Sequence, residues 1–198
     1  MVTESRVALR KDFSMMTGQF KQLTFTPTRG ASNWLWLSFF VILLDQSTKA
    51  MVLRSLELYD TVELLPILNI QNQHNAGAAF GILANASGWQ RWFFILLALG
   101  VSVFLMVWLR RIRTPEQNIL AVGLSLILGG ALGNVIDRVW LGYVVDFIHA
   151  HWHESDFPSF NVAGAAIAAG AACLLLDALL ESGRERLKGR DKNANPAG

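Results

Sequence analysis

The sequence of 198 residues is poor in both cysteine and charge. Its single cysteine, Cys173, excludes an intrachain disulfide, and its Ala- and Leu-rich surroundings are typical of apolar packing rather than of a nucleophile. Only 16% of the residues are charged, whereas soluble domains average about 25%. With 53% hydrophobic residues, this balance indicates a membrane protein. The net charge of +2 implies little by itself, and no nucleic-acid partner is expected.

Four apolar segments of roughly 20 residues follow a mixed, polar N-terminal stretch. They cover approximately residues 33–53, 91–109, 118–136 and 161–180. A helix of that length crosses about 30 Å of hydrocarbon, and a backbone inside lipid must satisfy its own hydrogen bonds. We therefore predict an all-α membrane protein. Its four-helix transmembrane bundle would span residues 33–182, flanked by polar tails at 1–32 and 183–198.

Small residues are concentrated in the last two apolar segments. The fourth is rich in Ala and Gly, and the third carries Gly123, Ser125, Gly129, Gly130 and Gly133. Small side chains let membrane helices approach one another closely, so these segments predict a compact bundle.

Lys and Arg residues are distributed unevenly between the connections. Each terminal tail holds five, and the short link between the second and third segments holds three. The longer connections, about 54–90 and 137–160, hold few. By the positive-inside rule, we expect both termini and the short link in the cytoplasm and the two longer connections outside.

The two outer connections contain segments that favour extended structure. The run from Thr61 to Ile70 is β-prone and partly alternating, and Pro66 within it would lie at an edge or a turn. The run YVVDFIHAHW, at 143–152, is also typical of a strand. We therefore expect a small extracytoplasmic β-sheet or platform on the outer face of the membrane.

Ionisable residues within or beside membrane segments are costly, which makes them candidates for function. Asp45 and Lys49 are four residues apart on one helix face and predict an ion pair, with contact to a substrate headgroup as the alternative. Asp137 is expected to hold a neighbouring segment by hydrogen bonds. Arg138 could do the same or could meet a lipid phosphate.

Asp146 is the acid best suited to chemistry. It lies in an otherwise apolar, strand-like run, VVDFI, directed at the bundle from the outer face. Burial would raise the pKa of its carboxyl group, so that it could act as an acid or a base; the alternative is a satisfied polar cap. Asn75 and Gly77 in NAGAAF permit either a tight loop or a ligand contact.

A further hypothesis rests on three alternating histidines. His149, His151 and His153 would share one face of a strand, as metal ligands can, and Glu154 and Asp156 follow closely. This pattern leaves open a metal-binding or transport protein.

Five motifs, in this order, resemble those of the prolipoprotein signal peptidases, or signal peptidase II: DQSTK, NAGAAF followed by GWQRWFF, GGALGNVIDR, VVDFI and FNVA. The resemblance covers roughly residues 34–180. It implies an aspartyl endopeptidase of the bacterial inner membrane that cuts lipoprotein precursors just before a diacylglyceryl-modified cysteine. The site would lie at the periplasmic face and need no metal or organic cofactor. The expected partners are the lipidated precursor and membrane lipids, and the expected state is a monomer.

The resemblance also assigns roles to individual residues. Asp146 would be one catalytic aspartate, and the second would end the FNxAD motif, where this chain has Gly164. The positions that would shape the site or hold the substrate are Asp45, Lys49, Asn75, Gly77, Asn134, Asp137, Arg138 and Asn161. In an aspartic dyad one carboxylate activates water while the other protonates the leaving group, and a glycine can do neither. The chain is therefore either an active peptidase or a catalytically impaired homologue that still binds lipidated precursors.

Overall fold

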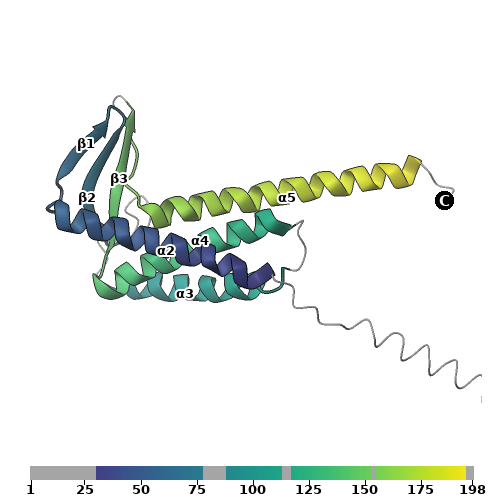
Figure 1. The fold of residues 1–198 in the computed structure, drawn as a ribbon, viewed down its shortest axis with the longest axis horizontal. Coiled ribbons are helices and arrows are strands. Elements are labelled where there is room, and N and C mark those ends of the chain that lie inside the picture. The colour runs from purple at the N-terminus through teal and green to yellow at the C-terminus, as the bar shows by residue number, and fades with distance from the viewer. Residues whose placement is uncertain (1–29, 78–87, 113–116, 153–154, 195–198) are drawn as a thin grey trace, which may run out of the picture.

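The protein is described by a computed structural model that places residues 30–77, 88–112, 117–152 and 155–194. This part of the chain forms four long helices, with a small antiparallel sheet at one end of them (Figure 1). The helices are α2 (Gly30–Ser55), α3 (Trp89–Leu109), α4 (Asn118–Trp140) and α5 (Val162–Ala194).

All four helices are long and apolar enough to cross a membrane, with mean hydropathies between 1.3 and 2.5 over the candidate spans. Their outer surfaces carry large apolar side chains, and Phe40, Leu96 and Phe104 are each more than half exposed. Such continuous apolar surface is unfavourable in water and suits contact with lipid chains. The predicted four-helix membrane bundle is confirmed, and its fourth helix continues past residue 180 to Ala194.

Helix α4 is the centre of the bundle and packs against each of the other three helices. Its glycines allow the backbones to meet. A Cβ atom on Gly130 would clash with the carbonyl oxygen of Ala163 in α5. A Cβ atom on Gly129 would lie 2.7 Å from the carbonyl oxygen of Ser38 in α2. The close approach predicted from the small residues of this segment is therefore present.

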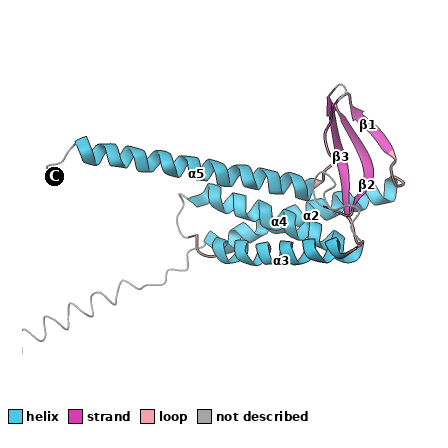
Figure 2. Ribbon diagram, turned by 180° about the vertical axis from the view of Figure 1, so that it is seen from behind, coloured by secondary structure: helices cyan, strands magenta, loops and turns pink. Residues whose placement is uncertain are grey.

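The sheet consists of three longer strands and one short strand, all antiparallel, in the order β1-β2-β3-β4. The strands are β1 (Thr61–Leu65), β2 (Leu68–Asn75), β3 (Val144–Trp152) and β4 (Ser155–Asp156). The β1–β2 turn falls just after Leu65, where Pro66 predicts it. The sheet stands across the ends of the helices (Figure 2). Both extended segments predicted from the outer connections are thus strands.

The chain reverses direction between α4 and β3 at Gly142, whose φ of 92° is a backbone conformation that favours glycine. This turn brings β3 back over the end of the bundle, where Val145 and Phe147 pack with Val52 of α2. Gln73 of β2 lies opposite Asp146 of β3 in the register. Asp146 is thereby held at the junction between the sheet and the helices.

One end of the bundle lies away from the sheet (Figure 1). It contains the start of α2, the end of α3, the start of α4 and the end of α5. The two longer connections, which contain the strands, lie at the other end. This is the grouping expected from the Lys and Arg distribution. Assignment of either end to the cytoplasm remains an expectation from sequence, and residues 1–29 lie outside the described part.

Candidate active site

Asp146 is the buried carboxylate at the centre of the site, with 6% of its surface exposed. Each of its two oxygens accepts a hydrogen bond from a side-chain amide. Asn75 Nδ2 donates to Oδ2 at 2.9 Å, and Asn161 Nδ2 donates to Oδ1 at 2.7 Å. The two asparagines come from β2 and from the residue that precedes α5, so two separate elements hold this carboxylate in place.

Backbone N–H groups orient both amides. The N–H of Gly77 donates to Asn75 Oδ1 at 2.9 Å, and the N–H of Gly164 donates to Asn161 Oδ1 at 2.7 Å. Because each amide oxygen is occupied in this way, the NH₂ group is directed at Asp146. The second contact also makes Asn161 the N-cap of α5, a position that favours asparagine.

The electrostatic surroundings of Asp146 suit proton transfer. Burial raises the pKa of its carboxyl group to about 6, while the hydrogen bond from Asn75 and the charges of Lys49 and Arg138 act in the opposite direction. At pH 7 the carboxyl group is therefore mostly ionised, yet basic enough to accept a proton. A carboxylate of this kind is suited to general-base chemistry.

Arg138, in the last turns of α4, holds the segment that directly follows Asn75 at the end of β2. Its Nη2 donates to the carbonyl oxygen of Gly77 at 2.7 Å, and its Nη1 donates to the carbonyl oxygen of Asn134 at 3.4 Å. The guanidinium also lies over the ring of Phe94 in α3, 5.1 Å from its centroid. The sequence predicts for Arg138 either hydrogen bonds to a neighbouring segment or contact with a lipid phosphate. The contacts observed here are with neighbouring segments of the chain.

An ion cluster lies inside the bundle beneath the site. Lys49 Nζ lies 2.7 Å from Asp45 Oδ2 and 2.8 Å from Asp137 Oδ2, and all three side chains are at most 3% exposed. The ion pair predicted from the four-residue spacing is present. Because the cluster is buried, it supports the site from within and does not line a surface.

Both carboxylates of this cluster also hold backbone groups of neighbouring elements. Asp45 Oδ1 accepts a hydrogen bond from the N–H of Ala163 at 2.8 Å, at the start of α5. Asp137 Oδ2 accepts one from the N–H of Val145 at 3.1 Å, next to Asp146 in β3. The architectural role expected for Asp137 is therefore what its contacts show.

Two polar side chains connect the cluster more widely. Asn134 Oδ1 accepts hydrogen bonds from Lys49 Nζ at 3.1 Å and from Asn161 Nδ2 at 3.2 Å, which links the cluster to the residue that holds Asp146. Gln46 Nε2 donates to Asp137 Oδ1 at 2.9 Å. Sequence reasoning missed Gln46, although its place inside an apolar segment directly after Asp45 was a usable signal.

Comparison with known proteins identifies the family. The sequence profile described as Signal peptidase (SPase) II matches residues 37–180. The chain belongs to the signal peptidase II family. A lipoprotein signal peptidase of Shewanella woodyi is 47% identical over 148 residues, which cover 74% of this chain and 83% of that relative. One from Pseudomonas paraeruginosa is 49% identical over 150 residues, covering 75% and 88% of the two chains.

A solved structure supports the fold. A bacterial membrane enzyme determined by the in meso method at 2.3 Å resolution superposes with a TM-score of 0.69 at 31% sequence identity. The match covers 77% of this chain and 91% of that one. This member of the signal peptidase II family is therefore a multi-pass membrane protein, and the similarities support a lipoprotein signal peptidase function.

Gly164 occupies the position at which the family motif predicts a second aspartate, in the first turn of α5. A Cβ atom there would lie 3.4 Å from Asn161 Oδ1 and 3.8 Å from Phe160 Cβ, which are ordinary contacts. The space around Gly164 is therefore wide enough for a Cβ atom, which glycine lacks. The neighbouring acids Asp45 and Asp137 are committed to Lys49 below the site.

The histidines of β3 form a separate feature. His149 and His151 lie on one face of the strand, with ring centroids 5.9 Å apart and ring planes at 28° to each other. His153 and Glu154 lie outside the described residues, as does the side chain of Asp156. Within the part of the chain that is placed, no group of three His, Cys, Asp or Glu side chains is arranged to hold a metal ion.

Proposed function

We propose that this chain acts on diacylglyceryl-modified lipoprotein precursors at the outer face of the bacterial inner membrane, as an aspartyl-type endopeptidase site that cleaves before the lipidated cysteine. Membership of the signal peptidase II family and the buried, doubly hydrogen-bonded Asp146 support this proposal. In this arrangement both termini are cytoplasmic, the chain is a monomer, and the precursor enters from the surrounding lipid.

Asp146 supplies one half of the reaction. Its carboxylate takes a proton from water as the water oxygen attacks the scissile carbonyl carbon. The amine that leaves must then gain a proton, which a second carboxyl group provides in an aspartic dyad. Gly164 has no group that can donate one. We therefore infer that this chain cleaves precursors several orders of magnitude more slowly than a site with both carboxyl groups, because the members of a catalytic unit act together.

Binding without cleavage is the second candidate function, and Gly164 is the observation that favours it. The carboxylate, both asparagines and the supporting ion cluster are all in place, so recognition of a precursor does not depend on the missing group. A chain of this kind would hold lipidated precursors in the membrane and release them uncut.

A cleavage assay with a lipidated precursor peptide tests the proposal directly. It compares the natural chain, Gly164→Asp, and Gly164→Asn, which matches the aspartate in size but carries no carboxyl group. We expect a gain of about 1,000-fold or more in Gly164→Asp alone. Equal rates in the natural chain and Gly164→Asp would show that the chain is not impaired. Failure of all three proteins to bind the precursor would overturn the proposed function itself.

A further inference from the structure

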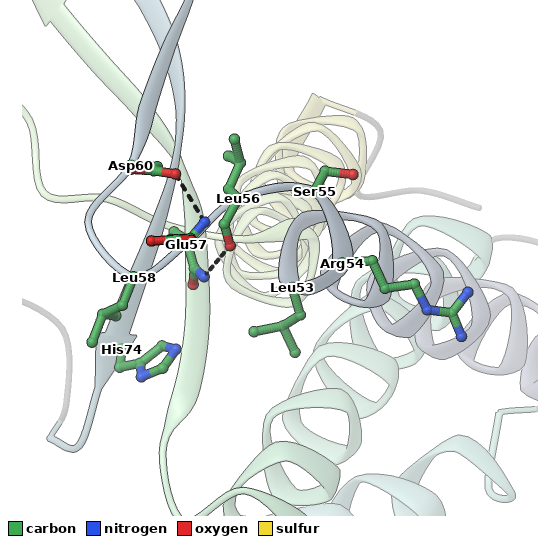
Figure 3. Close-up of a pocket in the computed structure, with 9 residues that line it drawn as sticks. Leu53, Arg54, Ser55, Leu56, Glu57, Leu58, Asp60 and His74 are labelled. Atoms are coloured by element: carbon green, nitrogen blue, oxygen red, sulfur yellow. Dashed lines mark hydrogen bonds between the residues drawn. The ribbon is translucent and has the colours of Figure 1, made fainter.

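A polar pocket of about 690 Å³ lies between the last turns of α2 and strand β2 (Figure 3). Its lining includes His74 and Asn72 of β2 and the segment that continues from Leu53 to Leu58. Successive side chains of a strand face opposite sides, so His74 faces away from Asn75 and therefore from Asp146. The pocket is thus separate from the candidate active site.

Two buried polar atoms in the wall of this pocket lack a hydrogen-bond partner among the described residues: Asn72 Oδ1 and His74 Nε2. Asn72 is only 4% exposed, and its Nδ2 is already used in a bond to the carbonyl oxygen of Leu56. His74 stacks on Tyr143, with ring centroids 3.7 Å apart, and burial lowers the pKa of its imidazole, which is therefore neutral at pH 7. Buried polar atoms are usually paired, so this wall is suited to a ligand that donates a hydrogen bond.

Charges of both signs line the same pocket. Figure 3 shows Glu57 and Asp60 on one side and Arg54 extending away from them on the other. The carboxyl end of α2, which carries partial negative charge, also lies on this pocket. Leu53 and Leu58 add apolar surface and are 37% and 44% exposed. Charges of opposite sign at the two sides favour a zwitterionic ligand.

The position of the pocket identifies the source of that ligand. The membrane-spanning part of α2 ends at Ser55, so the pocket begins where hydrocarbon gives way to lipid headgroups. We propose that it binds the headgroup of a phospholipid with a primary ammonium group, such as phosphatidylethanolamine. Arg54 contacts the phosphate, Glu57 and Asp60 contact the ammonium, and Asn72 Oδ1 accepts one of its hydrogen bonds. Leu53 and Leu58 lie against the glycerol and acyl chains.

Native mass spectrometry of the full chain in detergent tests this site without any need for catalysis. Delipidated protein is mixed with equal amounts of dioleoyl phosphatidylethanolamine, phosphatidylcholine and phosphatidylglycerol. We expect the ethanolamine lipid to be retained about fivefold more than the other two, because quaternary ammonium cannot donate a hydrogen bond and glycerol carries no cation. Equal retention of the three lipids would overturn the proposal. So would competition by water-soluble glycerophosphoethanolamine at concentrations as low as those of the lipid.

Pocket variants locate the binding. Arg54→Gln and the pair Glu57→Gln with Asp60→Asn should each lower retention of the ethanolamine lipid by about threefold to fivefold. Glu63→Gln, an exposed charge on β1 outside the pocket, is the matched control and should leave retention unchanged. Thermal unfolding verifies that each variant is folded. Folded pocket variants that retain the lipid as well as the control does would refute the site, whereas loss of precursor cleavage bears only on the proposed function.

Discussion

Replacement of Lys49 by methionine tests the ion cluster on which the site rests. The substitution removes the cation that lies 2.7 Å from Asp45 and 2.8 Å from Asp137 and leaves both carboxylates buried. Loss of one partner from a buried ion pair typically costs about 3–5 kcal/mol, because the remaining charge has lost its compensation. Each carboxylate keeps a backbone N–H donor, from Ala163 and Val145 respectively. This places the expected cost towards the lower end of that range.

Thermal unfolding in detergent, followed by circular dichroism, measures the effect. A loss of about 3–5 kcal/mol in the free energy of unfolding should lower Tm by about 6–20 °C, because 1 kcal/mol corresponds to about 2–4 °C in a chain of this length. Arg110→Gln, which removes an exposed charge at the end of α3, is the matched control and should change Tm little.

A triple variant separates the loss of charge balance from the loss of packing. Lys49→Met combined with Asp45→Asn and Asp137→Asn removes all three charges and keeps oxygen acceptors for both backbone N–H groups. It should recover most of the lost Tm, because neutral amides have no buried charge to compensate. The reasoning would be refuted if Lys49→Met behaved like the surface control. A triple variant no more stable than the single variant would refute it as well.

Three further predictions concern pH, packing and site geometry. The carboxyl group of Asp146 has a pKa of about 6 in the folded protein and about 3.9 in the unfolded chain. The unfolded chain therefore loses this proton at lower pH, so the stability that the protonated group contributes below pH 4 is lost as the pH rises through 6. Relative to Asp146→Asn, the natural chain should lose about 2 kcal/mol in unfolding free energy from pH 4 to 7; a constant difference would contradict this. Gly130→Ala should cost about 1–3 kcal/mol in unfolding free energy through contact with the α5 backbone, whereas Gly100→Ala, in open space, should be neutral or slightly stabilising. Arg138→Lys, made in the Gly164→Asp background, should lower kcat for precursor cleavage about tenfold at similar KM, and an unchanged kcat would argue against its positioning role.

The membrane helices were predictable because a single physical quantity, apolar length, decides whether a segment can span lipid. The predicted ends were less accurate where polar residues have partners inside the protein. The third segment was expected to end at Ile136, yet α4 continues to Trp140 because Asp137 and Arg138 are satisfied by neighbouring elements. Hydropathy scores such residues as though they faced water or lipid, and so places the boundary too early.

Contacts within one helix of the candidate site could be predicted from the sequence, whereas contacts between elements could not. The Asp45–Lys49 pair follows from local helical spacing, which a sequence displays directly. The second partner of Lys49 is Asp137, which lies far along the chain and meets it only after α2 and α4 have packed. The orientation of Asn75 and Asn161 likewise depends on backbone N–H groups whose directions are determined by the folded loops. Contacts of this kind depend on tertiary packing, and no single-sequence pattern contains them.

The capping of α5 by Asp45 has a consequence for how the protein is made. Asp45 belongs to the first of the four described membrane helices in chain order, and its backbone partner, Ala163, belongs to the last of these four. Asn161, which holds Asp146, immediately precedes that last helix. During synthesis, a chain with only three inserted helices therefore has neither the cap nor the clamp on its carboxylate. The site can therefore form only when α5 has joined the other three described helices.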